Sequence, residues 1–132
     1  MALSSLDTNV IVYAFQPGAR RSRALALLEQ RPVLSVQALN EYVHTSRRKF
    51  ARGWDEIERD LEAIRTLVAR IDPITDDCNK VALRIVGRYR LAFYDALIVA
   101  VALAGGARDL YSEDMQDGLV IDGTLRIVDP FR

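Results

Sequence analysis

The sequence predicts an α/β fold with a mainly parallel central sheet, and two observations support this prediction. Short apolar segments typical of buried strands alternate along the chain with longer segments of helical periodicity. The chain has 132 residues, of which 50% are hydrophobic and 27% are charged, as in an ordinary globular domain. We therefore expect a single domain that spans residues 1–132.

The first fifty residues are predicted to form two short strands and three helices. Gln16-Pro17-Gly18 ends the first helix, because proline cannot donate to the helix and glycine tolerates the turn. Ser35 is a favourable N-cap for the third helix. The expected strands are 3–6 and 32–35, and the expected helices are 10–15, 20–30 and 36–50.

The remaining sequence predicts three more helices and two more strands. In the segment 55–71, apolar side chains recur at spacings of three and four, which is typical of an amphipathic helix. Thr75 can cap a helix that runs to about residue 89. The segment 93–104 is apolar on nearly all sides and should be a buried helix, ended by Gly105-Gly106. The last strands are expected at 109–112 and 125–128.

The composition argues against several classes of protein. A single cysteine, Cys78, excludes an internal disulfide and fits a reducing compartment. Neither a signal peptide nor an apolar segment long enough to cross a bilayer is recognisable, so we expect a cytoplasmic protein without a membrane partner. Eighteen basic and eighteen acidic residues balance, which by itself does not favour nucleic-acid binding, although arginines cluster at 20–23, 47–52 and 84–90.

Asp95 is the most informative single residue, because it is the only charged side chain between Leu91 and Ala107. An unpaired carboxylate in an apolar helix is costly. It calls for a basic partner, for exposure at the helix N-terminus, or for a metal ion. The structural alternative is that Asp95 complements the helix dipole from the first turn.

Three further acids allow a functional or a structural interpretation. Asp7 follows a predicted strand and can cap the next helix, Glu41 lies within a helix and can be solvated, and Asp114 lies in a turn-rich acidic segment. Together with Asp95 they would suit a hard divalent cation, which prefers oxygen ligands and supports phosphodiester chemistry. Spacing alone does not show that the four converge.

Five segments taken in order resemble a PIN domain, and more closely a VapC-type toxin of a type II toxin–antitoxin pair. The resemblance covers essentially the whole chain. The segments are Leu6–Val10, Asn40-Glu41, Phe93–Ala100, Leu110–Gly118 and Ile127–Phe131.

This resemblance implies a three-layer α/β/α sandwich and an endoribonuclease in which a metal-activated water attacks the scissile phosphate. It implies Mg²⁺, or alternatively Mn²⁺, as the cofactor. RNA is the implied substrate, and a VapB-like antitoxin and a second copy of the chain are the implied partners. The implied catalytic and metal-binding residues are Asp7, Glu41, Asp95 and Asp114, with Thr8, Asn9 and Ser112 as polar supports and Asp117 as a further acidic contact.

Two extensions concern the binding of RNA and of the antitoxin. Arg48 shares a helix face with Glu41, and Arg52 would follow it, so both could hold RNA phosphates; alternatively the basic residues suit the negative end of the helix. Strand geometry should turn Glu113 away from the side that Asp114 faces. A groove between the segments 10–15 and 57–68 is the expected docking site for an apolar antitoxin segment.

Four alternatives remain open at this point. A PIN-fold nuclease could process RNA without an antitoxin, and a PIN fold that only binds would be expected to have lost an acid. A receiver domain would need paired acids after its first strand and a late lysine, but Asp7 stands alone and the last lysine is Lys80. A phosphatase of the haloacid dehalogenase type would need an aspartate where Asn9 stands.

Overall fold

The centre of the computed structural model, which describes residues 2–132, is a six-stranded sheet with the order β3-β2-β1-β4-β6-β5. Only β5 runs antiparallel to its neighbour, and the other pairs are parallel, which confirms the prediction of a mainly parallel sheet. The strands are β1 (Ser4–Leu6), β2 (Val33–Ser35), β3 (Arg70–Asp72), β4 (Asp109–Tyr111), β5 (Val120–Ile121) and β6 (Leu125–Val128).

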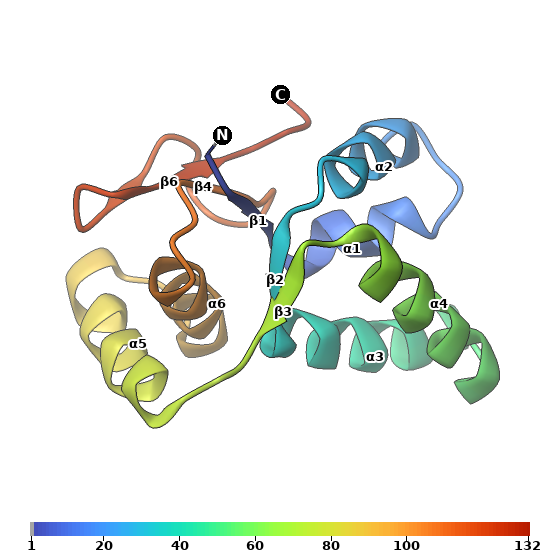
Figure 1. Ribbon diagram of the computed structural model, residues 1–132, viewed down its shortest axis with the longest axis horizontal. Coiled ribbons are helices and arrows are strands. Elements are labelled where there is room, and N and C mark those ends of the chain that lie inside the picture. The colour runs from blue at the N-terminus through green and yellow to red at the C-terminus, as the bar shows by residue number, and fades with distance from the viewer. Residues whose placement is uncertain (1) are drawn as a thin grey trace.

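Helices cover both faces of this sheet (Figure 1). One layer contains α1 (Thr8–Ala14), α2 (Arg21–Glu29), α3 (Val36–Phe50) and α4 (Trp54–Leu67), and the other contains α5 (Asp76–Tyr89) and α6 (Phe93–Ala104). This arrangement is the predicted three-layer α/β/α sandwich.

The core lies around α6 and the central strands. Seven successive residues of α6, from Ala96 to Ala102, are buried, as its apolar sequence predicts. Leu6, Leu34 and Leu110 of β1, β2 and β4 are fully buried beside it. Asp95 lies just before this buried run, in the first turn of α6, where the helix reaches the edge of the core.

The predicted helix 55–71 is wrong at its C-terminal end, because α4 stops at Leu67 and β3 follows. Val68 takes an extended conformation with ψ 159°, and the Ala69 amide donates to the carbonyl oxygen of Pro32 at 2.9 Å. Ile71 then pairs with Leu34 of β2. Its three-residue spacing from Val68 imitates helical periodicity, but pairing with a buried strand decides the conformation.

Two smaller differences concern the start of α1 and the short strand β5. α1 begins at Thr8 rather than at residue 10, because the Asp7 side chain already caps the helix at that point. The two-residue strand β5 was not predicted, since a strand this short leaves no alternation to detect.

Several apolar side chains of the segments proposed to form an antitoxin groove are internal. Val10 and Ile11 are fully buried, and Ile57 and Ile64 are 3% and 0% exposed. Tyr13, Phe15, Leu61 and Leu67 are only partly buried, so a docking groove between these segments stays a prediction. Within residues 2–132, no helix combines the length and the apolar character that a bilayer crossing requires.

The topology places a switch point next to β1. The chain leaves β1 toward β2 and β3 on one side and returns to β4 on the other side. Leu6 pairs with Tyr111, so Asp7 and Ser112, the residues that follow them, leave the sheet side by side. Ligands of open α/β sheets bind beyond the carboxyl ends of strands at such a point.

Candidate active site

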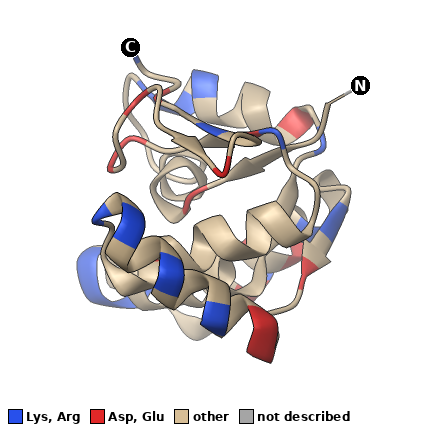
Figure 2. Ribbon diagram, turned by 90° about the vertical axis from the view of Figure 1, so that its left-hand side faces the viewer, with Lys and Arg blue, Asp and Glu red and all other residues tan. Residues whose placement is uncertain are grey.

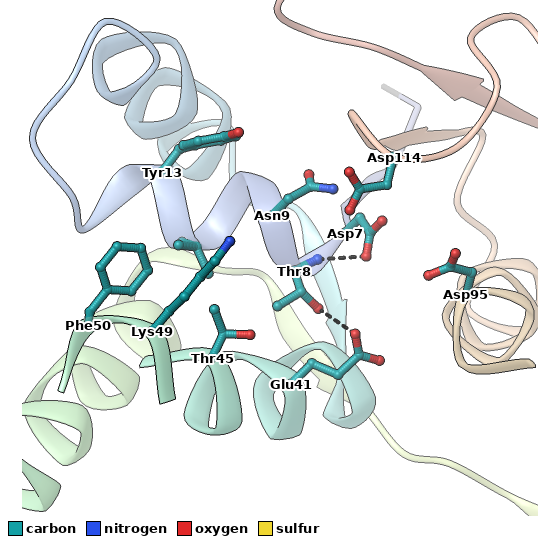
Figure 3. A pocket seen from close by; sticks show the side chains of 11 residues that line it. Asp7, Thr8, Asn9, Tyr13, Glu41, Thr45, Lys49, Phe50, Asp95 and Asp114 are labelled. Carbon is teal, nitrogen blue, oxygen red and sulfur yellow. Dashed lines mark hydrogen bonds between the residues drawn. The ribbon is translucent and has the colours of Figure 1, made fainter. Parts of the chain in front are cut away.

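The four predicted acids line one pocket of about 240 Å³ at this end of the sheet (Figure 3). They come from four separate segments: Asp7 follows β1, Glu41 lies on α3, Asp95 on α6, and Asp114 in the loop after β4. Thr8 and Asn9 line the same pocket. The fold thus brings together side chains that are separated by up to 107 positions in the sequence.

Asp7 is the most deeply buried of the four, with 3% of its surface exposed. One carboxylate oxygen accepts from the Thr8 amide at 2.7 Å and the other accepts from Ser112 Oγ at 2.8 Å. Burial raises the pKa of Asp7 to about 7, and Asp95 and Glu41 add to this rise, while the two hydrogen bonds oppose it. The predicted capping role and a place in the pocket are therefore both realised.

Glu41 is half-buried, and its two carboxylate oxygens have different donors. Gln37 Nε2, one turn earlier on α3, donates to Oε2 at 3.0 Å, and the Thr8 hydroxyl donates to Oε1 at 3.5 Å. Burial raises the pKa of Glu41, with a further contribution from the charge of Asp95. The side chain is thus held toward the pocket.

The negative charges of Asp95 and Asp114 lie close enough to affect each other. Burial raises the pKa of the half-buried Asp95, and the Asp114 carboxylate raises it further. Asp114 is exposed at the rim. Over residues 2–132, none of the four acids forms an ion pair with a lysine or arginine. The favourable interaction left for the Asp95 carboxylate is with the positive end of the α6 dipole, since Asp95 lies in the first turn of that helix.

The donor chemistry of this pocket fits a hard divalent cation. All four candidate ligands are carboxylates, and the pKa of three of them is raised by burial and mutual repulsion, which a cation would relieve. In the part of the chain that the structure describes, no three acidic, histidine or cysteine side chains are close enough to hold an ion as they stand. An ion would therefore have to draw the carboxylates together.

Ser112 and Asn9 connect the acidic residues to their surroundings. Ser112 is fully buried, and its Oγ accepts from the amides of Asp114 and Met115 while it donates to Asp7. Asn9 Oδ1 accepts from the Glu113 amide at 3.4 Å. The Asn9 amide nitrogen is buried without a hydrogen-bond partner among residues 2–132, although the residue lines the pocket.

Three other candidates lie away from the pocket. Asp117 accepts from the Asp129 amide at 2.8 Å and so holds the C-terminal segment. Arg52 donates to both carboxylate oxygens of the buried Asp60 at 2.8 Å, so it lies in an ion pair outside the pocket, and a contact of Arg52 with RNA stays a prediction. Arg48 is exposed and does not line the pocket.

Lys49 and Tyr13 line the pocket although no motif in the sequence marks them. Glu41, Thr45 and Lys49 follow one another at spacings of four on α3, and this row of side chains, rather than the row through Arg48, faces the cavity. The four-residue spacing is the signal that would have identified Lys49.

A second series of basic residues extends along α5 (Figure 2). Lys80, Arg84 and Arg88 recur at spacings of four on this helix. Arg84 donates to both carboxylate oxygens of Asp122, at 3.0 and 2.7 Å, and Lys80 lies 3.5 Å from Asp76. Much of the charge on α5 is therefore balanced by neighbouring acids.

The fold and the acidic pocket are those of a PIN domain, and a family model described as PIN domain matches residues 5–116. The chain belongs to the PIN-domain family. This membership excludes the receiver-domain and phosphatase alternatives. A comparison with curated proteins found no match.

Solved structures that resemble this chain include VapC toxins, which confirms the more specific resemblance seen in the sequence. A toxin–antitoxin complex from Klebsiella pneumoniae is 24% identical with a TM-score of 0.72, covering 96% of this chain and 97% of that chain. VapC20 from Mycobacterium tuberculosis, described as a sarcin–ricin loop cleaving toxin, is 26% identical with a TM-score of 0.66, covering 84% and 89%. DNA-bound VapBC from Salmonella typhimurium is 21% identical with a TM-score of 0.64, covering 98% and 99%.

Proposed function

We propose that the protein is a metal-dependent endoribonuclease that acts as the toxin of a VapBC-type pair. The observation that carries the proposal is a pocket lined by four carboxylates, none of which is neutralised by an ion pair within residues 2–132. RNA as the substrate class is supported by the description of VapC20 as a sarcin–ricin loop cleaving toxin.

Asp7, Asp95, Asp114 and Glu41 would hold Mg²⁺, for which Mn²⁺ is a chemical substitute. When bound, such an ion supplies positive charge that polarises the scissile phosphate and lowers the pKa of a water molecule. Ser112 and Thr8 fix the orientation of Asp7 through their hydrogen bonds. Asp7 would therefore be the ligand whose position is fixed by direct hydrogen bonds to its carboxylate, while Asp114 lies exposed at the rim.

Glu41 would complete the site or accept the proton of the attacking water. Gln37 and Thr8 orient its carboxylate toward the pocket, as a general base within reach of the water requires. The water oxygen bonds to phosphorus, the bond from phosphorus to the leaving nucleotide oxygen breaks, and the leaving oxygen takes a proton from solvent.

Lys49 would hold the RNA backbone beside the cleavage position. Among the described residues that line the pocket it is the only cationic one. A lysine ammonium is a point charge that suits a phosphate. In this proposal Lys49 holds the phosphate nearest the pocket, and the contacts predicted for Arg48 and Arg52, which lie outside the pocket lining, stay predictions.

Cleavage of an RNA panel, measured with and without Mg²⁺ or Mn²⁺, tests the proposed function. Wild type should cleave only with the divalent ion, and Asp7→Asn or Asp95→Asn should lower the rate about a hundredfold or more, since each removes a charged ligand. Asp76→Asn, an exposed acid at the start of α5, is the matched control and should leave the rate unchanged. Cleavage without metal, or full activity in both site variants, would exclude this mechanism.

The toxin role adds a VapB-like antitoxin as an expected partner, because several similar structures are toxin–antitoxin complexes. A homodimer stays an expectation from the family resemblance. A short antitoxin-like reading frame beside the gene, whose product suppresses RNA cleavage when added in equal amount, would support this role. If the protein cleaves RNA but the product of no neighbouring gene suppresses the cleavage, the alternative of an RNA-processing nuclease without an antitoxin is favoured.

A further inference from the structure

Asp114 is held differently from Asp7 and Glu41. Its carboxylate, like that of Asp95, makes no hydrogen bond or ion pair with any of residues 2–132, whereas Asp7 and Glu41 are each held by two donors. Its position therefore depends on the backbone of the loop that carries it. Within that loop the Asp114 amide donates to Ser112 Oγ at 3.2 Å.

The preceding residue, Glu113, anchors this loop to α1 and to the start of α2. Its backbone amide donates to Asn9 Oδ1 at 3.4 Å, and its Oε1 accepts from the Tyr13 hydroxyl at 2.6 Å. Its Oε2 lies 2.7 Å from Arg20 Nε. Asn9 and Tyr13 are four residues apart, on the face of α1 that is turned toward the Asp114 loop (Figure 3).

Aromatic contacts support the same arrangement. The Arg20 guanidinium lies 5.4 Å from the centre of the Tyr13 ring and 5.5 Å from that of Phe131. The Tyr13 and Phe131 rings meet edge to face with their centres 5.2 Å apart. A single exposed ion pair contributes little to stability, but here the guanidinium also contacts two aromatic rings that pack on each other, which favours this position of Arg20.

We infer that Glu113, held by Asn9, Tyr13 and Arg20, is a positioning residue that sets the place of Asp114 and thereby the affinity of the pocket for its cation. We call these four residues the Glu113 clasp. Glu113 does not line the pocket, and both of its carboxylate oxygens are engaged by Tyr13 and Arg20, so its carboxylate is not a further ligand. The inference rests on the proposed function for the identity of the cation site, but not for the behaviour of the loop.

Two variants break the Glu113 clasp outside the pocket. Glu113→Gln removes the charge that pairs with Arg20, and Arg20→Gln removes the cation without changing a pocket residue. Arg126→Gln is the matched control. It breaks an exposed ion pair of 3.3 Å between Arg126 of β6 and Asp109 of β4, and neither residue belongs to the Glu113 clasp or to the Asp114 loop. Thermal unfolding of each variant checks that the fold is intact.

Two measurements test the inference on these proteins. Hydrogen–deuterium exchange of the peptide that covers residues 112–116 should become several-fold faster in both clasp variants and stay unchanged in Arg126→Gln. The Kd for Mn²⁺, measured by titration calorimetry, should rise about tenfold in both clasp variants, as is typical when a residue that orients a ligand is lost. Unchanged exchange, or faster exchange with an unchanged Kd, would overturn the inference.

The outcomes also separate the inference from the proposed function. If wild type binds Mn²⁺ but cleaves no RNA, the proposed function fails, and the two measurements still decide the role of Glu113. If wild type binds no Mn²⁺, both the cation site and the claim that Glu113 sets its metal affinity are overturned.

Discussion

Asp7 illustrates how a single residue can be both structural and functional. Its side chain caps α1, yet it is buried beside two other carboxylates, and its pKa is raised to about 7. Each unit of pKa shift corresponds to about 1.4 kcal/mol. Because the folded state binds the Asp7 proton more tightly than the unfolded state does, the metal-free fold loses stability as the pH rises from about 4 to about 7.

The prediction at the residue scale concerns the contact of Lys49 with RNA. Lys49→Gln should raise the KM for RNA about tenfold and lower the slope of log affinity against log salt by about one, because one phosphate contact is lost. Arg48→Gln is the matched control, since Arg48 is the exposed neighbour outside the pocket lining. Cleavage kinetics over a salt series measure both quantities, and equal effects of the two substitutions would contradict the assignment.

The sequence predicted the four acids and the polar residues beside them, but not the basic residue of the pocket, and the residues show why. Asp7, Glu41, Asp95 and Asp114 stand in motifs of fixed local pattern, so a family resemblance identifies them. Lys49 stands in no such motif, and its place in the pocket depends on which row of α3 faces the cavity. The ion pair of Arg52 with Asp60 was not foreseen, because Asp60 comes from the next helix, and helix periodicity does not reveal such a contact.

At the scale of elements, a polar cluster joins α3 to α4. Tyr42 donates to Asp60 Oδ2 at 2.6 Å, and Arg52 donates to both oxygens of the same carboxylate. Tyr42 is 1% exposed and Asp60 is 6% exposed, so the cluster is largely removed from water. It fixes the end of α3, which carries Lys49 to the pocket.

Arg52→Ala should lower the free energy of unfolding by about 2 kcal/mol, because it leaves the buried Asp60 carboxylate without its cation. The estimate is below the range for fully buried pairs because the Arg52 side chain is 23% exposed. Arg126→Ala, at the exposed pair with Asp109, should change the free energy by less than about 0.5 kcal/mol. Urea unfolding of both variants makes the comparison, and equal losses would refute the role of the cluster.

Element boundaries show where sequence patterns stop being informative. The helices with clear caps, α3 after Ser35 and α5 after Thr75, lie where the sequence predicts them, because a cap is a local signal. β3 was missed because Val68 and Ile71 continue the helical spacing of α4, and β5 because its two residues show no alternation; both strands form through pairing with β2 and β6. Such strands are determined by the neighbouring strand and not by their own periodicity.

At the scale of the whole molecule, the fold concentrates negative charge in one place while the chain as a whole has no net charge. The overall balance of 18 basic and 18 acidic residues therefore says little about the pocket. The parallel sheet brings the ends of β1 and β4 together, and α3 and α6 add one acid each from opposite layers. Convergence of the acids is a property of the topology.

The most direct test of the cation site is the thermal unfolding of wild type and Asp7→Asn, with and without Mn²⁺, at pH 5 and pH 8. Without metal, Asp7→Asn should be more stable than wild type at pH 8, where Asp7 is ionised, and this advantage should shrink or vanish at pH 5, where Asp7 is protonated. Saturating Mn²⁺ should raise the unfolding temperature of wild type at pH 8 by several degrees and that of Asp7→Asn much less. An equal response of the two proteins to Mn²⁺, or no response of wild type, would contradict the assignment of the four carboxylates to a cation site.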